Sequence, residues 1–255
     1  MPATLPNIYL LRAPYDRYCE VDPGSVVQRG ECIVWFLRPG SSAADVERVQ
    51  AMRQGRTLVV ILPPAEEIMQ VRAVLPRIAE MAPHGVLPAG HIATPEHIQA
   101  LLQLPPRDLA GRIIDYLTFR RVLRPGEMRR EIRKVLELAR EVTSIAALSR
   151  RLYMSRRTLG RHLETHRLPV PSHWLQFGRL MYVANQLQCG NSAVFRVATA
   201  FGYPDGFTMS NQMRRMLGIR PSQLRDYLGI EWMIDAWLDY ERGFAAAEGK
   251  EFCIE

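Results

Sequence analysis

The sequence predicts an α/β domain at the amino terminus and an all-α region after it. Short apolar runs alternate with helical stretches over residues 7–104, and this alternation is typical of a sheet covered by helices. Pro105 and Pro106 end this part, because two prolines in succession cannot continue a helix. From Asp108 onward the chain is almost entirely helical in its apolar periodicity.

Three apolar runs are the expected strands of the amino-terminal domain. They lack the alternation of apolar and polar residues that a half-exposed strand has, so we expect buried strands of a partly parallel sheet. The runs are Ile8–Leu11, Cys32–Leu37 and Thr57–Leu62, and Gly85–Pro88 is a candidate for one more short strand.

Helices are expected wherever apolar residues recur with helical spacing after a residue that commonly starts a helix. Ser42, Pro64 with Ala65, and Thr94 with Pro95 are the expected starts. The corresponding helices cover residues 43–54, 66–81 and 95–104, and an amphipathic connector covers residues 108–123 before Pro125 and Gly126.

These elements divide the chain into four segments. Residues 1–106 are expected to form an α/β regulatory or dimerisation domain, and residues 107–127 a helical linker. Residues 128–228 form a helical domain, and residues 229–255 an acidic amphipathic tail helix.

Charge is distributed unevenly over these segments. The chain has 33 Lys and Arg against 26 Asp and Glu, and the net charges are +1 for residues 1–127, +11 for residues 128–228 and −5 for residues 229–255. Only Lys134 and Lys250 are lysines, so part of the arginine content could reflect genome composition. A compositional bias would spread arginine evenly, however, whereas a +11 segment is what a phosphate-neutralising surface requires.

Several classes of protein are disfavoured by what the sequence lacks. It contains no apolar run of about 18 residues and no leader pattern, which predicts a soluble cytoplasmic protein without membrane contact. No nucleotide-binding or nucleophile-elbow motif occurs, so we do not expect an enzyme. We expect neither a metal nor another cofactor, because four cysteines are scattered at Cys19, Cys32, Cys189 and Cys253, and His84, His91 and His97 lack metal-ligand spacing.

Two short helices joined by a tight turn are predicted within residues 144–166. Ser144 can cap a helix with Ile145, Leu148 and Leu152 inward, and Ser155 a second with Leu159 and Leu163 inward. This arrangement is typical of a helix-turn-helix. The second helix then exposes a mainly cationic face that suits the major groove of DNA, formed by Arg156, Arg157, Gly160, Arg161 and Glu164.

The same pattern recurs about fifty residues later. Residues 192–201 are an expected helix, residues 202–205 a turn with Asp205 as cap, and residues 206–217 a second helix. Here the chain resembles the carboxy-terminal signature of the AraC/XylS family of bacterial transcription regulators. The residues that carry the resemblance are Ala198, Gly202, Tyr203, Phe207, Met213, Gly218, Pro221 and Arg225, with Leu148, Ser155, Thr158, Leu159, Arg161, Leu163, Arg179, Leu180, Ala184 and Leu187 in the first motif and linking helix.

The resemblance covers residues 128–228 and implies double-stranded DNA as the partner. It implies contacts from Arg157, Gly160 and Arg161 in the first recognition helix, and from Gly206, Phe207, Ser210 and Asn211 in the second. Arg156, on the exposed cationic face of the first helix, is a further expected DNA-binding residue. The chain departs from the family where the first recognition helix ends. The family usually has a glycine there, whereas this chain has Leu168 followed by Pro169, so the helix is expected to end without a left-handed glycine. Phe207 has an alternative role as a core residue packed on Tyr203, and either helix face could simply be solvated.

The function expected is sequence-specific regulation of transcription through two recognition helices in adjacent major grooves. The alternative is an adaptor that binds nucleic acid nonspecifically and docks a protein on its α/β domain. A homodimer through residues 1–106 or the linker, an RNA polymerase contact and a small-molecule effector all stay open. For the tail helix, packing on its own domain competes with a partner contact or an acidic cover over the basic face.

The amino-terminal domain is weakly similar to a response-regulator receiver, which would give a receiver-like or reduced flavodoxin-like sheet. The strand that would carry the phosphate-accepting aspartate ends in Trp35, Phe36 and Leu37 instead. Phosphotransfer needs a carboxylate nucleophile and acids that bind Mg²⁺. We therefore predict that residues 1–104 are not regulated by aspartyl phosphorylation.

Overall fold

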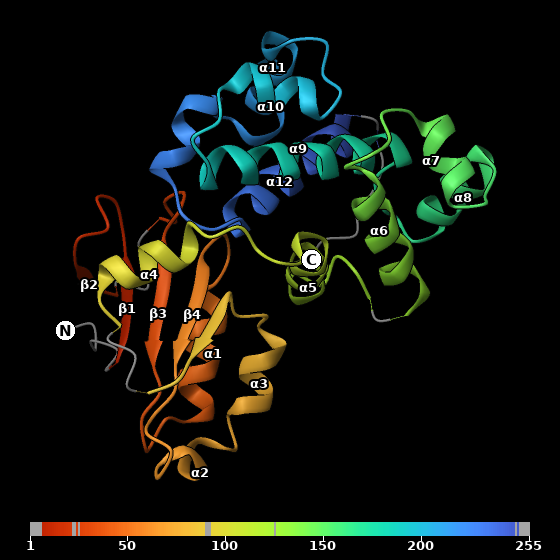
Figure 1. Ribbon diagram of the computed structural model, residues 1–255. Coiled ribbons are helices and arrows are strands. Elements are labelled where there is room, and N and C mark those ends of the chain that lie inside the picture. The colour runs from red at the N-terminus through yellow and green to blue at the C-terminus, as the bar shows by residue number, and fades with distance from the viewer. Residues whose placement is uncertain are drawn as a thin grey trace. The chain divides into compact units, whose positions relative to one another are not determined.

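The protein folds into two compact units, as a computed structural model shows; it describes residues 7–21, 24, 26–89, 93–124, 126–247 and 249. The first, here called the sheet unit, comprises Met1–Leu104 and Asp226–Trp232. The second, the helical unit, comprises Pro105–Arg225 and Met233–Glu255. The expected order of an α/β part before an all-α part is confirmed (Figure 1). His91, Pro125, Lys250 and Cys253 lie outside the described residues.

The sheet unit contains a mixed five-stranded sheet in the order β2-β1-β3-β4-β5. Strands β3, β4 and β5 run parallel, as expected, whereas β1 is antiparallel to both β2 and β3. The strands are β1 (Ile8–Leu11), β2 (Tyr18–Glu20), β3 (Cys32–Phe36), β4 (Thr57–Ile61) and β5 (Gly85–Leu87).

The partly parallel sheet is confirmed, and β1 is the buried strand that departs from the parallel arrangement. Among the described residues between β1 and β3 there is no helix, and a parallel neighbour would need a crossover of a dozen or more residues, usually helical. The strand order equals that of a flavodoxin-like sheet, but a hairpin replaces the first strand–helix unit. A receiver-like topology is therefore not confirmed, and β3 ends in Phe36 without a carboxylate.

Helices cover both faces of the sheet (Figure 1). The caps expected at Ser42 and Thr94 are confirmed, since their hydroxyls accept from the backbone N–H groups of Asp45 and His97. The single helix expected over residues 66–81 is instead two, because the ring of Pro76 obstructs a continuous helix. The helices are α1 (Ala43–Met52), α2 (Ile68–Val71), α3 (Leu75–Glu80) and α4 (Pro95–Leu102).

The segment Asp226–Trp232, called the return segment below, completes the core of the sheet unit. Leu228 is fully buried in a cluster with Val59, Ile98 and Leu102. The backbone of Tyr227 and Leu228 passes so close to Gly30 that a Cβ there would lie 2.8 Å from the Leu228 nitrogen. The structure thus places this segment with the sheet unit, and not with the helical domain or the tail expected from the sequence.

An ion-pair network fixes the return segment. The carboxylate of Glu231 accepts a hydrogen bond of 2.7 Å from the hydroxyl of Thr57 and lies 3.6 Å from the guanidinium of buried Arg53 and from the ring of His84. The hydroxyl of Tyr15 donates to the backbone carbonyl of Asp226 over 3.1 Å. A buried carboxylate needs partners of this kind, because an uncompensated charge in the interior is strongly destabilising.

The helical unit is organised around α9 (Pro171–Cys189), whose buried side chains form much of its core. Gly178 permits a close approach to α6, since an added Cβ would lie 2.8 Å from the Cβ of Ala139. The remaining elements are α5 (Leu109–Phe119), α6 (Glu127–Leu138), α7 (Ile145–Arg151), α8 (Arg156–Thr165), α10 (Val194–Ala200), α11 (Gly206–Leu217), η1 (Pro221–Asp226) and α12 (Glu231–Ala247).

The tail helix α12 packs on the helical unit, which agrees with the expected alternative of a helix packed on its own domain. Its Trp237 ring stacks on Phe177 with centroids 3.9 Å apart. Asp235 accepts from Tyr116 over 3.0 Å, and Glu241 lies 2.8 Å from His173. Most of the acidic face expected at the surface is thus engaged inside the protein.

None of the described helices combines the length and apolar character needed to cross a membrane.

Candidate nucleic-acid interface

The first pair of short helices, α7 and α8, forms as the sequence predicts. Both caps are confirmed: Ser144 Oγ accepts from the Ala147 N–H over 3.2 Å, and Ser155 Oγ accepts from the Thr158 N–H over 3.0 Å. Leu148, Leu159 and Leu163 are buried. These apolar residues therefore fix which face of α8 points outward.

Two residues in left-handed backbone conformation shape the pair of helices α7 and α8, and neither residue is glycine. Tyr153 in the turn has φ +55° and a side chain that is 97% exposed. Arg167 after α8 has φ +53°, and the Leu168 N–H donates to the Leu163 carbonyl over 3.0 Å. The helix thus ends with a Schellman-type hydrogen bond although the glycine usual in the family is absent.

The outward face of α8 carries Arg156, Arg157 and Arg161, all exposed. Within the described part of the chain, their guanidinium groups form no ion pair, whereas Arg133 pairs with Asp108 and Glu137. Gly160 lies on the same helix, and an added Cβ there would have no neighbour within 4 Å. The face is therefore cationic and available to an external anion.

An ionisable pair holds α8 against α6. The Nδ1 atom of His162 lies 3.2 Å from both carboxylate oxygens of Glu131, which is itself buried. Because this pair sits on the inner side of α8, it positions the helix without using the outward arginines.

The second pair of helices, α10 and α11, is also confirmed. Asp205 caps α11, since its carboxylate accepts from the Thr208 N–H over 2.6 Å, and this bond lowers the pKa of Asp205. Gly202 in the turn and Gly218 after α11 are left-handed, with φ +73° and +69°. Helix α10 begins at Val194, two residues later than expected, and Ala193 before it offers no side-chain cap.

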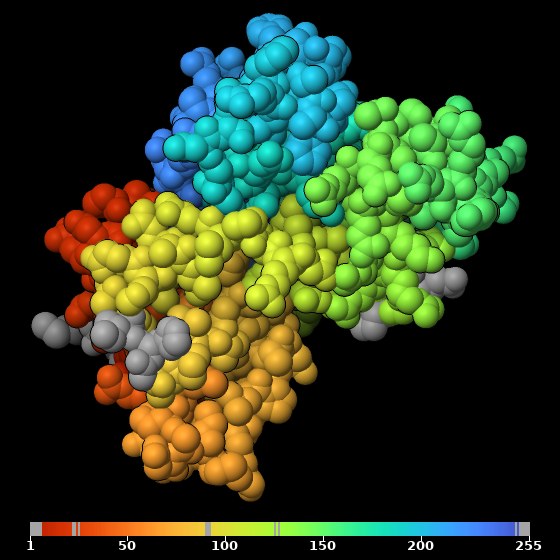
Figure 2. All heavy atoms as spheres, in the orientation of Figure 1, coloured from red at the N-terminus to blue at the C-terminus, as the bar shows by residue number. Residues whose placement is uncertain are grey.

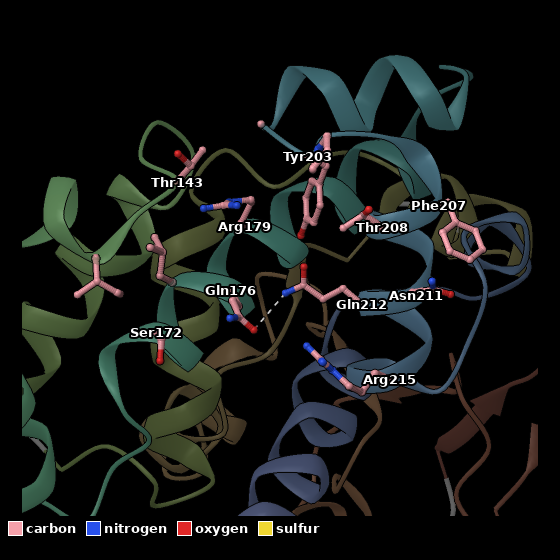
Figure 3. A pocket seen from close by; sticks show the side chains of 14 residues that line it. Thr143, Ser172, Gln176, Arg179, Tyr203, Phe207, Thr208, Asn211, Gln212 and Arg215 are labelled. Atoms are coloured by element: carbon pink, nitrogen blue, oxygen red, sulfur yellow. Dashed lines mark hydrogen bonds between the residues drawn. The ribbon is translucent and has the colours of Figure 1, made fainter.

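Phe207 is exposed, which contradicts its alternative role as a core residue packed on Tyr203. Its side chain is 76% exposed and stands away from Tyr203 (Figure 3). The reason is the helical register: Met209, Met213 and Met216 form the buried face of α11, and Phe207 falls outside it. Tyr203 is buried instead, with the guanidinium of Arg179 5.6 Å from its ring centroid.

The other predicted residues of α11 have different surroundings. Asn211 is exposed, whereas the Ser210 hydroxyl donates to the Gly206 carbonyl over 2.6 Å. An added Cβ at Gly206 would meet only ordinary contacts, the nearest being the Phe195 Cα at 3.7 Å. Asn211 and Phe207 are therefore the side chains at these four positions that are free to meet a partner.

Positions in α8 and α11, the outer helices of the two pairs, correspond when each helix is numbered from its cap, because the two caps lie fifty residues apart. Counted from the caps Ser155 and Asp205, Arg157 corresponds to Phe207, and Arg161 corresponds to Asn211. The structure thus brings the predicted residues to equivalent places on two separate lobes of the helical unit, green and cyan to blue in Figure 2.

A groove of about 570 Å³ adjoins the outer face of α11 (Figure 3). No acidic residue lines it, and within it the Gln212 amide donates to Gln176 over 3.5 Å. Desolvation lowers the pKa of Arg179, which stays a cation. The polar stripe that α9 adds to this wall, Ser172, Gln176 and Arg179, was not predicted as part of the site, although its helical spacing is visible in the sequence. The groove is lined by Thr143, Ser172, Gln176, Arg179, Tyr203, Phe207, Thr208, Asn211, Gln212 and Arg215 among others.

Comparison with known families decides the class of this region. Residues 148–227 match the family model described as a helix-turn-helix domain. This part of the chain is an AraC-type helix-turn-helix domain. The protein is accordingly a DNA-binding transcription regulator, and the family is one of regulatory domains and not of enzymes. No curated protein and no solved structure matched the chain.

Proposed function

We propose that the AraC-type domain binds double-stranded DNA sequence-specifically, with α8 and α11 in two adjacent segments of the major groove. The observation that carries this proposal is the pair of capped, exposed helices whose outer residues correspond at a constant offset. Double recognition helices of this kind need contact segments one helical turn apart, because only then do both face the same side of the duplex.

The side chains of α8 are suited to guanine. Arg157 and Arg161 lie four residues apart and therefore on one face of the helix. Each guanidinium can donate two hydrogen bonds to guanine O6 and N7, which is the commonest specific contact in the major groove. Arg156 and the close approach allowed at Gly160 complete this face, and the absence of ion-pair partners for these arginines within the described residues leaves their donors available.

The side chains of α11 offer other chemistry. Asn211 can bond adenine at N6 and N7, while Gly206 at the helix start faces Val194 and Phe195 of α10. The Ser210 hydroxyl already donates a hydrogen bond to the Gly206 carbonyl, so toward DNA it can act only as an acceptor. The second segment is therefore expected to differ in base composition from the first.

Selection of binding sites from random duplex DNA tests the proposal. We expect an enriched motif in two parts whose centres lie about one helical turn, or roughly 10 base pairs, apart. Recovery of no enriched motif would contradict it. The adaptor alternative predicts a steep salt dependence with equal affinity for selected and random duplexes, because phosphate contacts alone carry no sequence information.

A further inference from the structure

We infer that Phe207 recognises a thymine through its C5-methyl group, so that α11 reads an A·T-containing segment. This inference rests on the proposed function and extends it from the presence of a recognition helix to the base that the helix prefers. Three features carry it: the place of Phe207 on α11, the chemistry left at the neighbouring positions, and the charge of the adjoining groove.

The place of Phe207 is that of a base-contacting residue. It is the second residue of α11 after the cap, where α8 has Arg157, and the first residues of a recognition helix are those that contact base edges. With its ring 76% exposed, Phe207 projects from the protein at this point.

The chemistry at this helix start is apolar. A phenyl ring has neither a donor nor an acceptor, and the thymine methyl is the apolar group that a base pair presents in the major groove. Asn211 lies one turn further on the same face and suits adenine. Together these two side chains favour thymine and adenine, while no arginine occupies any of the four matched positions that α8 uses for its cationic face.

The surroundings favour a polyanion over a protein as the surface that covers the ring. The groove beside Phe207 has no acidic lining residue and includes the cations Arg179 and Arg215. The negative phosphodiester backbone next to the contacted bases would lie against this positively charged wall of the groove. A protein that bound the exposed rings of Phe207 and Phe195, which are 76% and 64% exposed, is the competing occupant that the experiment excludes or reveals.

The experiment replaces single thymines of the selected duplex by deoxyuridine, which lacks only the methyl group. For the full-length protein we expect a loss of about fourfold in affinity at one thymine of the second segment, equivalent to about 0.8 kcal/mol for one buried methyl group. Phe207→Ala is expected to bind the thymine duplex about as weakly as the wild type binds the deoxyuridine duplex. This variant should also show no further loss on that substitution, because the contact is already gone.

Two variants serve as matched controls. Asn211→Ala should lower affinity at an adenine yet keep the deoxyuridine effect, and Phe195→Ala should keep both the affinity and the effect. Circular dichroism of Phe207→Ala is expected to match the wild type, since the side chain is exposed.

Three results would overturn the inference. They are a deoxyuridine effect that persists in Phe207→Ala, a Phe207→Ala variant with unchanged affinity and specificity, and a loss that is the same for every sequence. The unchanged variant would point to a protein partner for the ring. In each of these cases a bipartite motif with an arginine-dependent first segment would leave the proposed function intact, whereas failure of the selection would remove both.

Discussion

The two helix-turn-helix units share one frame but stabilise it differently. Each unit needs a left-handed residue in its turn and another after its outer helix. The second unit uses Gly202 and Gly218 there, whereas the first uses Tyr153 and Arg167. A side chain in this conformation costs roughly 1–2 kcal/mol. Both units form the helix-ending hydrogen bonds with or without glycine, and at Gly202 a side chain would also be crowded by Thr143.

The recognition faces differ in the same orderly way. At equivalent positions the first helix presents Arg157 and Arg161, and the second presents Phe207 and Asn211. The first unit is thus equipped for charge-assisted bonds and the second for apolar and amide contacts. A duplicated fold can thus divide recognition between two chemistries, although the turns and the outer helices of its two copies differ in length.

The largest effect is expected when the turn of the second unit receives the side chain of the first. Gly202→Tyr should lower the free energy of unfolding of the helical unit by at least about 2 kcal/mol. The left-handed conformation accounts for about 1–2 kcal/mol, and a Cβ there would lie 2.5 Å from Thr143 Cγ2. Amide hydrogen exchange in α9–α11 measures the change, and unaltered protection would show that the two turns tolerate side chains equally.

The next effect concerns binding through the first unit. Arg161→Ala should weaken binding to the preferred duplex by about 1–3 kcal/mol and relax selectivity at one base position. Arg133→Ala is the control, because Arg133 already pairs with Asp108 and Glu137. A titration at several salt concentrations separates the cases, since a lost phosphate contact weakens all sequences alike. If Arg161→Ala bound every duplex as the wild type does, α8 would not be a recognition helix.

A smaller effect of opposite sign is expected in the first turn. Tyr153→Gly relieves the left-handed strain of the turn. It also makes the unfolded chain more flexible, which lowers the free energy of unfolding by about 0.5–1 kcal/mol. The net gain in stability should be at most about 1.5 kcal/mol, because the exposed ring has no packing to lose. Thermal unfolding of the full-length protein measures it. A marked loss of stability would mean that the tyrosine side chain contributes to the turn.

The smallest effect is a difference in pH dependence between the caps. The pKa of Asp205 is lowered by the Thr208 N–H bond, so its contribution to stability is present above the unfolded-state pKa near 3.9 and is lost as the pH falls. Asp205→Ser should therefore reduce the fall in thermal stability between pH 6 and pH 3. Ser155→Asp should increase that fall in the first unit. Identical pH profiles for wild type and both variants would contradict the role of the caps.

Local signals in the sequence predicted most of the helical unit. The caps Ser144, Ser155 and Asp205 and the buried leucines of α7 and α8 depend on residues three or four apart, which periodicity detects. Pro76 was also a local signal for the break between α2 and α3. Phe207 was harder, because an aromatic residue at helical spacing is usually buried, and only the register of the methionines of α11 excludes it from the core.

Long-range features of the sheet unit could not be predicted in this way. The direction of β1 depends on its pairing with β2, whose three residues are too short for a recognisable alternation. The left-handed Tyr153 and Arg167 have no sequence signature, since glycine is the usual residue there. The burial of Glu231 beside Thr57 joins positions far apart in the chain, and its carboxylate looked like part of an exposed acidic helix.

The return segment also has a consequence for how the protein is made. A ribosome synthesises residues 1–104 well before it adds Leu228 and Glu231, so the sheet unit leaves the exit tunnel without part of its core. The helical unit likewise waits for Trp237, which stacks on Phe177. Both units therefore finish folding only after residues 228–237 have been translated. A message that ended translation at residue 225 would remove core residues from both units at once.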